Sequence, residues 1–84
     1  MPTENSVSDY RLWLPAELRA ARHEVGLTQK QVATRMDWSP SKMLRIEAGA
    51  VSISTTDLLA LLDCYPVIPA DRKSELVEMV RKNR

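Results

Sequence analysis

The sequence has little of what could hold a small fold together through cross-links. Its 84 residues contain one cysteine, Cys64, and one histidine, His23. A single cysteine excludes an intrachain disulfide, and these two side chains cannot supply the four ligands of a structural zinc site. A chain of this length suffices for one domain. We therefore expect a fold that depends on packing alone, in the reducing environment of the cytoplasm.

Glycine, phenylalanine and long apolar runs are also scarce. Two glycines and no phenylalanine argue against a β-sheet. Apolar runs such as 58–62 are far shorter than the ~18 residues of a membrane span, and the N-terminus lacks the apolar stretch of a signal peptide. No glycine-rich phosphate loop or carboxylate cluster on one helical face is present. We expect a protein that is not an enzyme, with no membrane segment, cofactor or metal ion.

The charges are nearly balanced, with twelve Lys and Arg against eleven Asp and Glu. The net charge of +1 therefore creates no overall field that would mark a polyanionic partner. Cations outnumber anions locally, however, in residues 28–50 and again in residues 70–84. The apolar share of 44% and the charged share of 27% are typical of a globular protein and not of a disordered one.

Apolar residues at helical spacing and good capping residues predict five helices and no strand. Thr28, Ser39 and Ser54 are the expected N-caps, and Gly26 and Asp37 suit the left-handed residues that end helices. The predicted helices are 15–25, 28–36, 39–48, 54–65 and one that starts near residue 69. An all-α domain is therefore expected over residues 14–84.

The N-terminal part, residues 1–13, is expected to be an arm that is only partly flexible. Residues 1–8 are polar and without periodicity, which predicts a mobile segment. The apolar residues between Tyr10 and Leu14 predict one short turn packed on the core, with Pro15 keeping Leu14 out of helical geometry.

The helices 28–36 and 39–48 are both short and are separated only by Asp37 and Trp38. Two short helices joined by a tight turn are the layout of a helix-turn-helix. A helix fits the major groove of DNA, and the side chains near its N-terminus and on its outward face reach the base edges. The second of these helices carries Ser39, Ser41, Lys42 and Arg45 in that region.

Four motifs carry a resemblance to a known family. They are Gly26-Leu27-Thr28-Gln29, Val32-Ala33, Trp38-Ser39-Pro40-Ser41-Lys42 and Arg45-Ile46-Glu47. With these motifs the chain resembles the lambda-repressor-like, or xenobiotic-response-element (XRE), family of helix-turn-helix regulators, and within it the actinobacterial branch. The resemblance covers about residues 14–67. It implies a compact five-helix DNA-binding domain with the helix-turn-helix at the second and third helices.

The resemblance also implies roles for single residues. Arg45 is the best candidate for sequence readout, because a guanidinium pairs bidentately with guanine. Arg22 and Glu47 match a pair that forms an internal salt bridge between the first and third helices. Gln29 matches a residue that holds a phosphate with its side chain and its backbone N–H. The positions expected to face bases are Ser39, Pro40, Ser41 and Arg45, and those expected at phosphates are Thr28, Gln29, Lys30 and Lys42.

The chain departs from the family pattern at three places. Residues 48–52 offer no basic side chain to the DNA backbone, Leu44 stands where a small polar residue is usual, and Asp37 replaces the common turn glycine. Phosphate neutralisation supplies much of the free energy of DNA binding. We therefore expect weak binding by a monomer, compensated by dimerisation or by another domain.

The expected function is a sequence-specific transcriptional regulator of the repressor type. It would read the major groove of double-stranded DNA with helix 39–48, as a homodimer on half-sites about one helical turn, ~34 Å, apart. The alternative is a protein-interaction module, such as an antitoxin or adaptor, that binds a partner through Leu44, Val51 and the last helix. A larger C-terminal effector domain also stays open.

Seven further side chains have roles that the sequence leaves partly open. Trp38 is expected to pack on Met43 more than to stack on a base, Cys64 to be a small buried hydrophobe and His23 to face solvent. The apolar side chains of the last helix are either ordinary core or a dimer surface. They are Leu76, Val77, Met79 and Val80.

Overall fold

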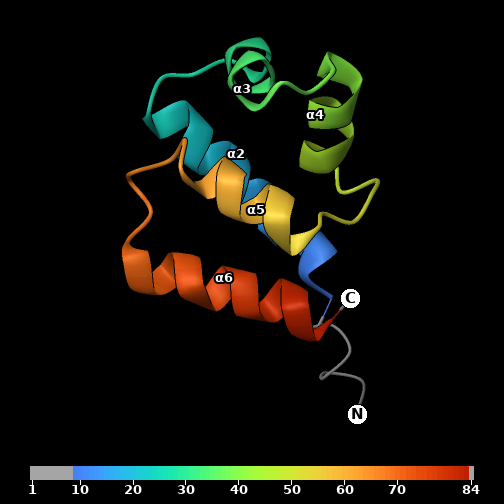
Figure 1. Ribbon diagram of the computed structural model, residues 1–84, viewed down its shortest axis with the longest axis vertical. Coiled ribbons are helices and arrows are strands. Elements are labelled where there is room, and N and C mark those ends of the chain that lie inside the picture. The colour runs from blue at the N-terminus through green and yellow to red at the C-terminus, as the bar shows by residue number, and fades with distance from the viewer. Residues whose placement is uncertain (1–8, 84) are drawn as a thin grey trace.

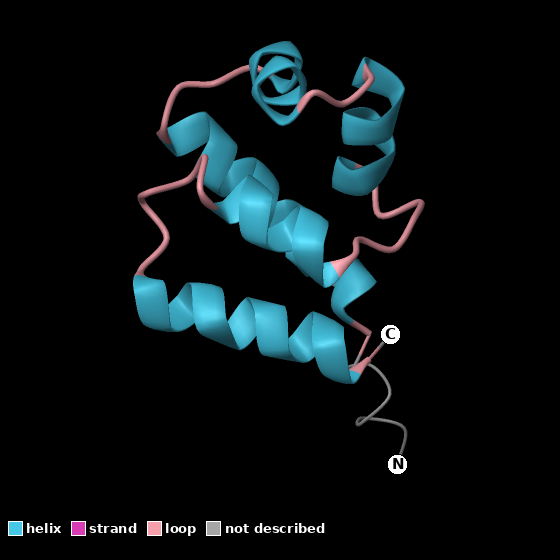
Figure 2. Ribbon diagram, viewed as in Figure 1, coloured by secondary structure: helices cyan, strands magenta, loops and turns pink. Residues whose placement is uncertain are grey.

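The computed structural model describes residues 9–83. Within these residues it contains a single 3₁₀ turn, five α-helices and no strand, as Figure 2 shows by colour. The elements are η1 (Tyr10–Leu12), α2 (Leu14–Glu24), α3 (Gln29–Met36), α4 (Pro40–Glu47), α5 (Thr55–Leu62) and α6 (Ala70–Lys82). The all-α prediction is confirmed. The mobile arm predicted over residues 1–8 lies outside the described residues.

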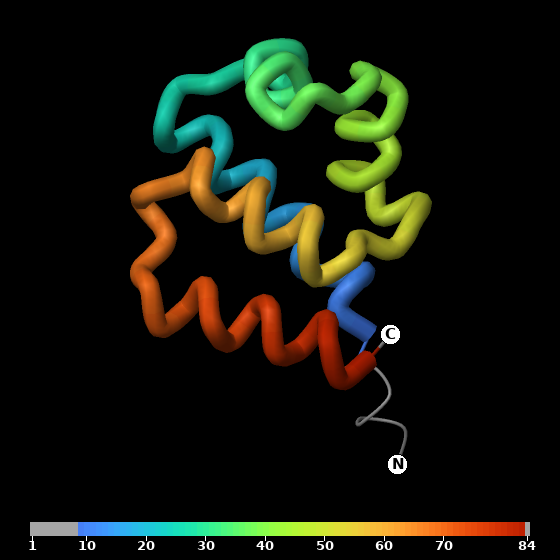
Figure 3. The backbone as a smooth tube through the Cα atoms, in the orientation of Figure 1, coloured from blue at the N-terminus to red at the C-terminus, as the bar shows by residue number. Residues whose placement is uncertain are grey.

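The helices lie in three tiers along the longest axis of the molecule. In Figure 1, α3 and α4 lie at one end, α6 lies at the other, and α2 and α5 lie between them. Helix α4 packs on both α3 and α2, whereas α5 packs on α6. The tube in Figure 3 follows the chain from α2 out to the α3–α4 pair and back through α5 to α6. The α3–α4 pair is therefore carried on a base formed by the other helices.

One hydrophobic core joins all of these elements. Its fully buried members include Val32 of α3, Met43 of α4 and Leu58 of α5, which lie far apart in the sequence. The largest buried side chains are Tyr65, Leu14, Leu18, Met43, Leu58, Leu61, Leu62 and Leu76. Because every helix contributes to this close-packed core, packing throughout the domain holds α3 and α4 in their relative orientation.

Local capping starts three of the helices where the sequence predicts. The Thr28 hydroxyl accepts from the backbone N–H of Gln31 (3.0 Å), and the Gln31 side chain accepts from the N–H of Thr28 (2.8 Å). The Ser39 hydroxyl caps α4 by accepting from the backbone N–H of Lys42 (3.1 Å), and Pro40 is at the first helical position. Ser54 caps α5. These caps are confirmed, and each satisfies an N–H group that the helix itself leaves without a partner.

Two helix boundaries differ from the prediction. Leu14 is the first residue of α2, so the expectation that Pro15 would keep it out of the helix was wrong. Leu14 is almost fully buried, and its packing outweighs the local preference before a proline. Helix α5 ends at Leu62 and not at Tyr65, because the N–H groups of Cys64 and Tyr65 bond three residues back, to Leu61 and Leu62. The chain therefore turns before Pro66.

The apolar side chains of α6 belong mainly to the core. Leu76, Val77 and Val80 are buried, and Met79 is half-buried. The sequence left open whether these side chains are ordinary core or a dimer surface. The three buried residues are ordinary core. Cys64 is half-buried where a buried position was expected, and partial burial raises the pKa of its thiol. His23 is exposed, as expected.

Candidate nucleic-acid interface

The turn between α3 and α4 is short and closed by backbone hydrogen bonds. Asp37 has the left-handed conformation (φ 58°), the only such non-glycine residue in the described part of the chain. The N–H of Trp38 then bonds back to the carbonyl of Ala33 (2.9 Å). Asp tolerates this conformation better than most residues, so it serves where glycine is common. The departure at Asp37 therefore leaves the turn intact.

Helix α4 has one buried and one exposed side. Met43, Ile46 and Glu47 point into the domain, whereas all four residues predicted to face bases are exposed. These four are Ser39, Pro40, Ser41 and Arg45. The hydroxyl of Ser39 accepts the cap hydrogen bond but keeps its own proton to donate. Ser39, Pro40 and Ser41 thus lie at the N-terminal end of α4, and Arg45 lies in its last turn, one helical turn beyond Ser41.

Arg45 has no hydrogen bond or ion pair through its side chain within residues 9–83. It is one turn beyond Ser41, and residues four apart on a helix share a face. A guanidinium has five N–H donors in a planar arrangement that matches two acceptors on a guanine edge. The geometry of Arg45 therefore suits an acceptor outside this domain.

Lys42 is different from Arg45, because its charge already has partners. Its Nζ is 3.0 Å from the Asp57 carboxylate of α5 and 4.6 Å from the centre of the Trp38 ring. Both ion-pair partners are about one third exposed. The pairing of Lys42 with Asp57 was not predicted from the sequence. In a phosphate contact by Lys42, the phosphate would compete with Asp57 for the lysine charge.

The first turn of α3 borders an open hollow on the protein surface. The hollow measures about 610 Å³ and is lined by Arg22, His23, Gly26, Leu27, Thr28, Gln29 and Lys30. Lys30 is exposed and has no charged partner in the described part of the chain. The N–H groups at the first positions of a helix have no acceptor within it. Three of the four residues predicted at phosphates therefore lie side by side at this hollow.

Arg22 and Glu47 form a buried, bidentate ion pair between α2 and α4. The Nε of Arg22 donates to Oε2 of Glu47 (2.8 Å) and Nη2 donates to Oε1 (3.0 Å). The two residues are only 7% and 3% exposed. The hydrogen bond from Arg22 to Glu47 raises the pKa of the guanidinium, which stays charged in the core.

This pair is the centre of a wider network. Nη1 of Arg22 donates to the carbonyl of Leu27 (3.0 Å), and Nε2 of Gln29 donates to Oε1 of Glu47 (2.9 Å). Arg19 adds a hydrogen bond to the backbone carbonyl of Glu47 (3.1 Å). The network ties α2, the start of α3 and the end of α4 together. The role of Arg19 was not predicted from the sequence, although Arg19 lies three residues before Arg22 on α2.

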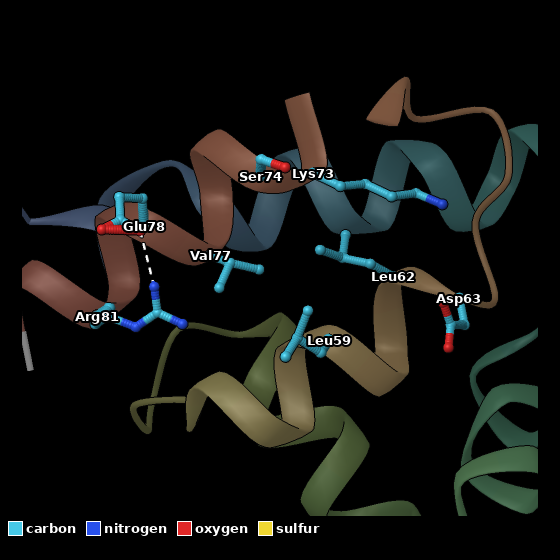
Figure 4. Close-up of a pocket in the computed structure, with 8 residues that line it drawn as sticks. All are labelled: Leu59, Leu62, Asp63, Lys73, Ser74, Val77, Glu78 and Arg81. Carbon is cyan, nitrogen blue, oxygen red and sulfur yellow. Dashed lines mark hydrogen bonds and ion pairs between the residues drawn. The ribbon is translucent and has the colours of Figure 1, made fainter. Parts of the chain in front are cut away.

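A separate groove of about 250 Å³ lies between α5 and α6 (Figure 4). Leu59, Leu62 and Val77 project between the two helices, with charged side chains around them. One pair of these charges is already matched, since Arg81 donates to Glu78 (2.8 Å). The described residues contain no group of His, Cys, Asp and Glu that could hold a metal ion. Nor does any described helix have the length and apolar character needed to cross a membrane.

The five helices, the tight turn and the exposed side of α4 together define a helix-turn-helix domain. A family described as "helix-turn-helix domain" matches residues 13–76. This is well over half of the 84 residues, so the chain belongs to the helix-turn-helix domain family. The match includes α3, α4 and every residue predicted at bases or phosphates. No curated protein and no solved structure matches the chain.

Proposed function

We propose that this protein is a sequence-specific transcriptional regulator of the XRE type and of its actinobacterial branch. It reads the major groove with residues 39–48 and acts in the cytoplasm as a repressor, with no catalytic role. The observation that carries the proposal is Arg45, which lies on the outward side of α4, beside Ser41, and whose guanidinium has no partner within residues 9–83. An arginine at this place on a second, major-groove helix is suited to a guanine edge.

The support for phosphate binding comes from the hollow at the start of α3. The N-terminal end of a helix attracts anions through its free N–H groups and its dipole. Lys30 adds a positive charge there, and Gln29 is held in place by Glu47 (2.9 Å). In this proposal the backbone N–H of Gln29 and the side chain of Lys30 bind one DNA strand while α4 enters the groove.

The proposal includes a homodimer on a two-fold operator with half-sites ~34 Å apart. A two-fold protein matches a two-fold DNA site, and two weak modules together bind more tightly than either alone. The buried side chains of α6 pack in the core of the domain, so that face of the helix is not available to a second copy. The exposed Leu59, at the groove between α5 and α6, is the apolar residue that a second copy would meet there.

The alternative function is a protein-interaction module, such as an antitoxin or adaptor. Two exposed apolar side chains favour it, since Leu44 is 56% and Val51 is 37% exposed. Exposed apolar side chains that form a contiguous patch often mark partner surfaces. A regulator with an additional C-terminal effector domain is compatible with the same observations.

The test is a selection of binding sites from randomised duplex DNA with the purified chain at low salt. We expect a two-fold motif whose affinity falls steeply with salt, because each phosphate contact releases counterions. Two substitutions of Arg45 separate its role in reading the DNA sequence from the effect of its charge. Arg45→Ala and Arg45→Lys should both flatten the preference among sequences, whereas Arg45→Lys should keep the salt dependence.

Lys82→Ala is the matched control, because it removes the same charge from an exposed position at the end of α6. It should leave sequence preference unchanged. Recovery of no motif by the wild-type chain would overturn sequence-specific regulation and favour the interaction module. An unchanged motif in Arg45→Ala would remove Arg45 from the readout role.

A further inference from the structure

Leu44 is an exposed apolar side chain of α4 that lies beside the residues predicted to face bases. It lies three residues after Ser41 and directly before Arg45, and it is 56% exposed. Residues three apart on a helix are neighbours, so Leu44 and Ser41 lie side by side. The other large exposed apolar residues lie on other elements or loops. They are Leu12, Val51, Leu59 and Val67.

We propose that Leu44 determines part of the sequence specificity by contacting the C5-methyl group of a thymine. This inference depends on the proposed function, because it requires α4 to enter the major groove. Thymine is the one base that presents an apolar group on its major-groove edge. The edges of the other bases present hydrogen-bonding groups, which a leucine would cover without giving them a partner.

The structure supports a DNA contact more than a protein contact at this position. Leu44 adjoins Ser41, and Ser41 lies one helical turn before Arg45, so the three exposed residues form a continuous strip on α4. A partner protein that covered Leu44 and its neighbour Ser41 would come close to the charged guanidinium of Arg45, at a cost unless it supplied an acceptor. The major groove offers both a methyl group and acceptors within neighbouring base pairs.

The experiment uses the operator recovered by selection, with each thymine replaced in turn by deoxyuridine. This replacement removes only the methyl group. For the thymine that contacts Leu44 we expect about a four-fold loss of affinity of the full chain, the effect of one buried methyl. In the Leu44→Ala variant the same replacement should have no effect, whereas Leu44→Met, which keeps an apolar contact, should retain it.

A second methyl provides an independent check. With cytosine at the identified position, 5-methylcytosine should bind the wild-type chain better than cytosine does, and Leu44→Ala should not distinguish them. Val51→Ala is the control for apolar truncation outside α4 and should keep the full response to the methyl. Thermal melting of each variant verifies that the fold is retained.

The outcomes separate this inference from the proposed function. If an operator is recovered but no thymine is sensitive to loss of its methyl, the role of Leu44 is overturned and sequence-specific binding stands. The same holds if the sensitivity persists unchanged in Leu44→Ala. If no operator is recovered, the proposed function itself fails, and the thymine contact fails with it.

Discussion

Arg22 and Glu47 are 25 residues apart in the sequence and form two hydrogen bonds, of 2.8 and 3.0 Å, in the interior of the domain. Their pairing joins α2 to the last residue of α4. Moving both charges out of water costs free energy, and the attraction within the pair offsets this cost only when both side chains have their hydrogen bonds satisfied. The pair therefore favours one relative orientation of the two helices, and with it one orientation of the side of α4 that carries Arg45.

The first prediction concerns the loss of one partner. Glu47→Ala leaves the Arg22 guanidinium buried without its carboxylate, and it also removes the acceptor of Gln29. We expect the free energy of unfolding to fall by about 3–5 kcal/mol, measured by urea denaturation.

A double variant serves as the control for this prediction. Arg22→Met with Glu47→Leu removes both charges and should recover most of the lost stability, because no unpaired charge is left in the core. An unchanged unfolding midpoint in Glu47→Ala would show that the pair does not stabilise the fold.

The second prediction compares the two glycines, which have nearly the same left-handed backbone. Gly49 has φ 74° and Gly26 has φ 78°, but a Cβ on Gly49 would lie 3.1 Å from the carbonyl oxygen of Arg11, whereas one on Gly26 would meet nothing within 4 Å. Alanine at either position costs about 1–2 kcal/mol for the positive φ. Gly49→Ala should lose more stability than Gly26→Ala, because η1 must also move. Equal losses in thermal melting would show that the approach of Arg11 is unimportant.

Local features of this fold could be predicted from the sequence because their causes are local. The caps at Thr28, Ser39 and Ser54 each depend on a hydroxyl and an N–H three residues later. The helix-turn-helix layout follows from those caps and from the short turn between them. The boundary at Leu14 could not be predicted, since it depends on burial against other helices.

The candidate site was predictable only in part. The Arg22–Glu47 contact is present where the resemblance implied it. The ion pair of Lys42 with Asp57 depends on where the start of α5 lies relative to α4, which no pattern within either helix predicts. The same is true of the Arg19 contact to the carbonyl of Glu47. The assignments to bases and phosphates stay predictions.

The third prediction follows from the Lys42–Asp57 pair. Asp57→Asn removes a carboxylate that competes with DNA phosphate for Lys42. A partly exposed ion pair contributes up to about 1 kcal/mol, so we expect DNA affinity to rise by up to about five-fold, equally for specific and random sequences. The measurement is fluorescence-anisotropy titration at several salt concentrations.

Lys42→Ala provides the opposing variant. It should weaken binding to all sequences alike and reduce the magnitude of the salt slope by about one. In the Lys42→Ala background, Asp57→Asn should lose most of its benefit. A full benefit in that background would show that Asp57 acts by repelling DNA and not by holding Lys42.

The last prediction concerns Tyr65, whose side chain is fully buried and whose hydroxyl has no hydrogen-bond partner within residues 9–83. An unpaired buried hydroxyl costs about 1–3 kcal/mol, so Tyr65→Phe should stabilise the domain or leave it unchanged.

Burial also raises the pKa of Tyr65 above its usual 10.0. The unfolded chain therefore releases the phenolic proton first, and the wild type loses stability as the pH rises past 10. The variant lacks this loss, so its advantage in urea unfolding should be about 1.4 kcal/mol larger at pH 11 than at pH 8. A destabilised variant would mean that the hydroxyl is bonded in solution, and an advantage independent of pH would mean that Tyr65 ionises equally in both states.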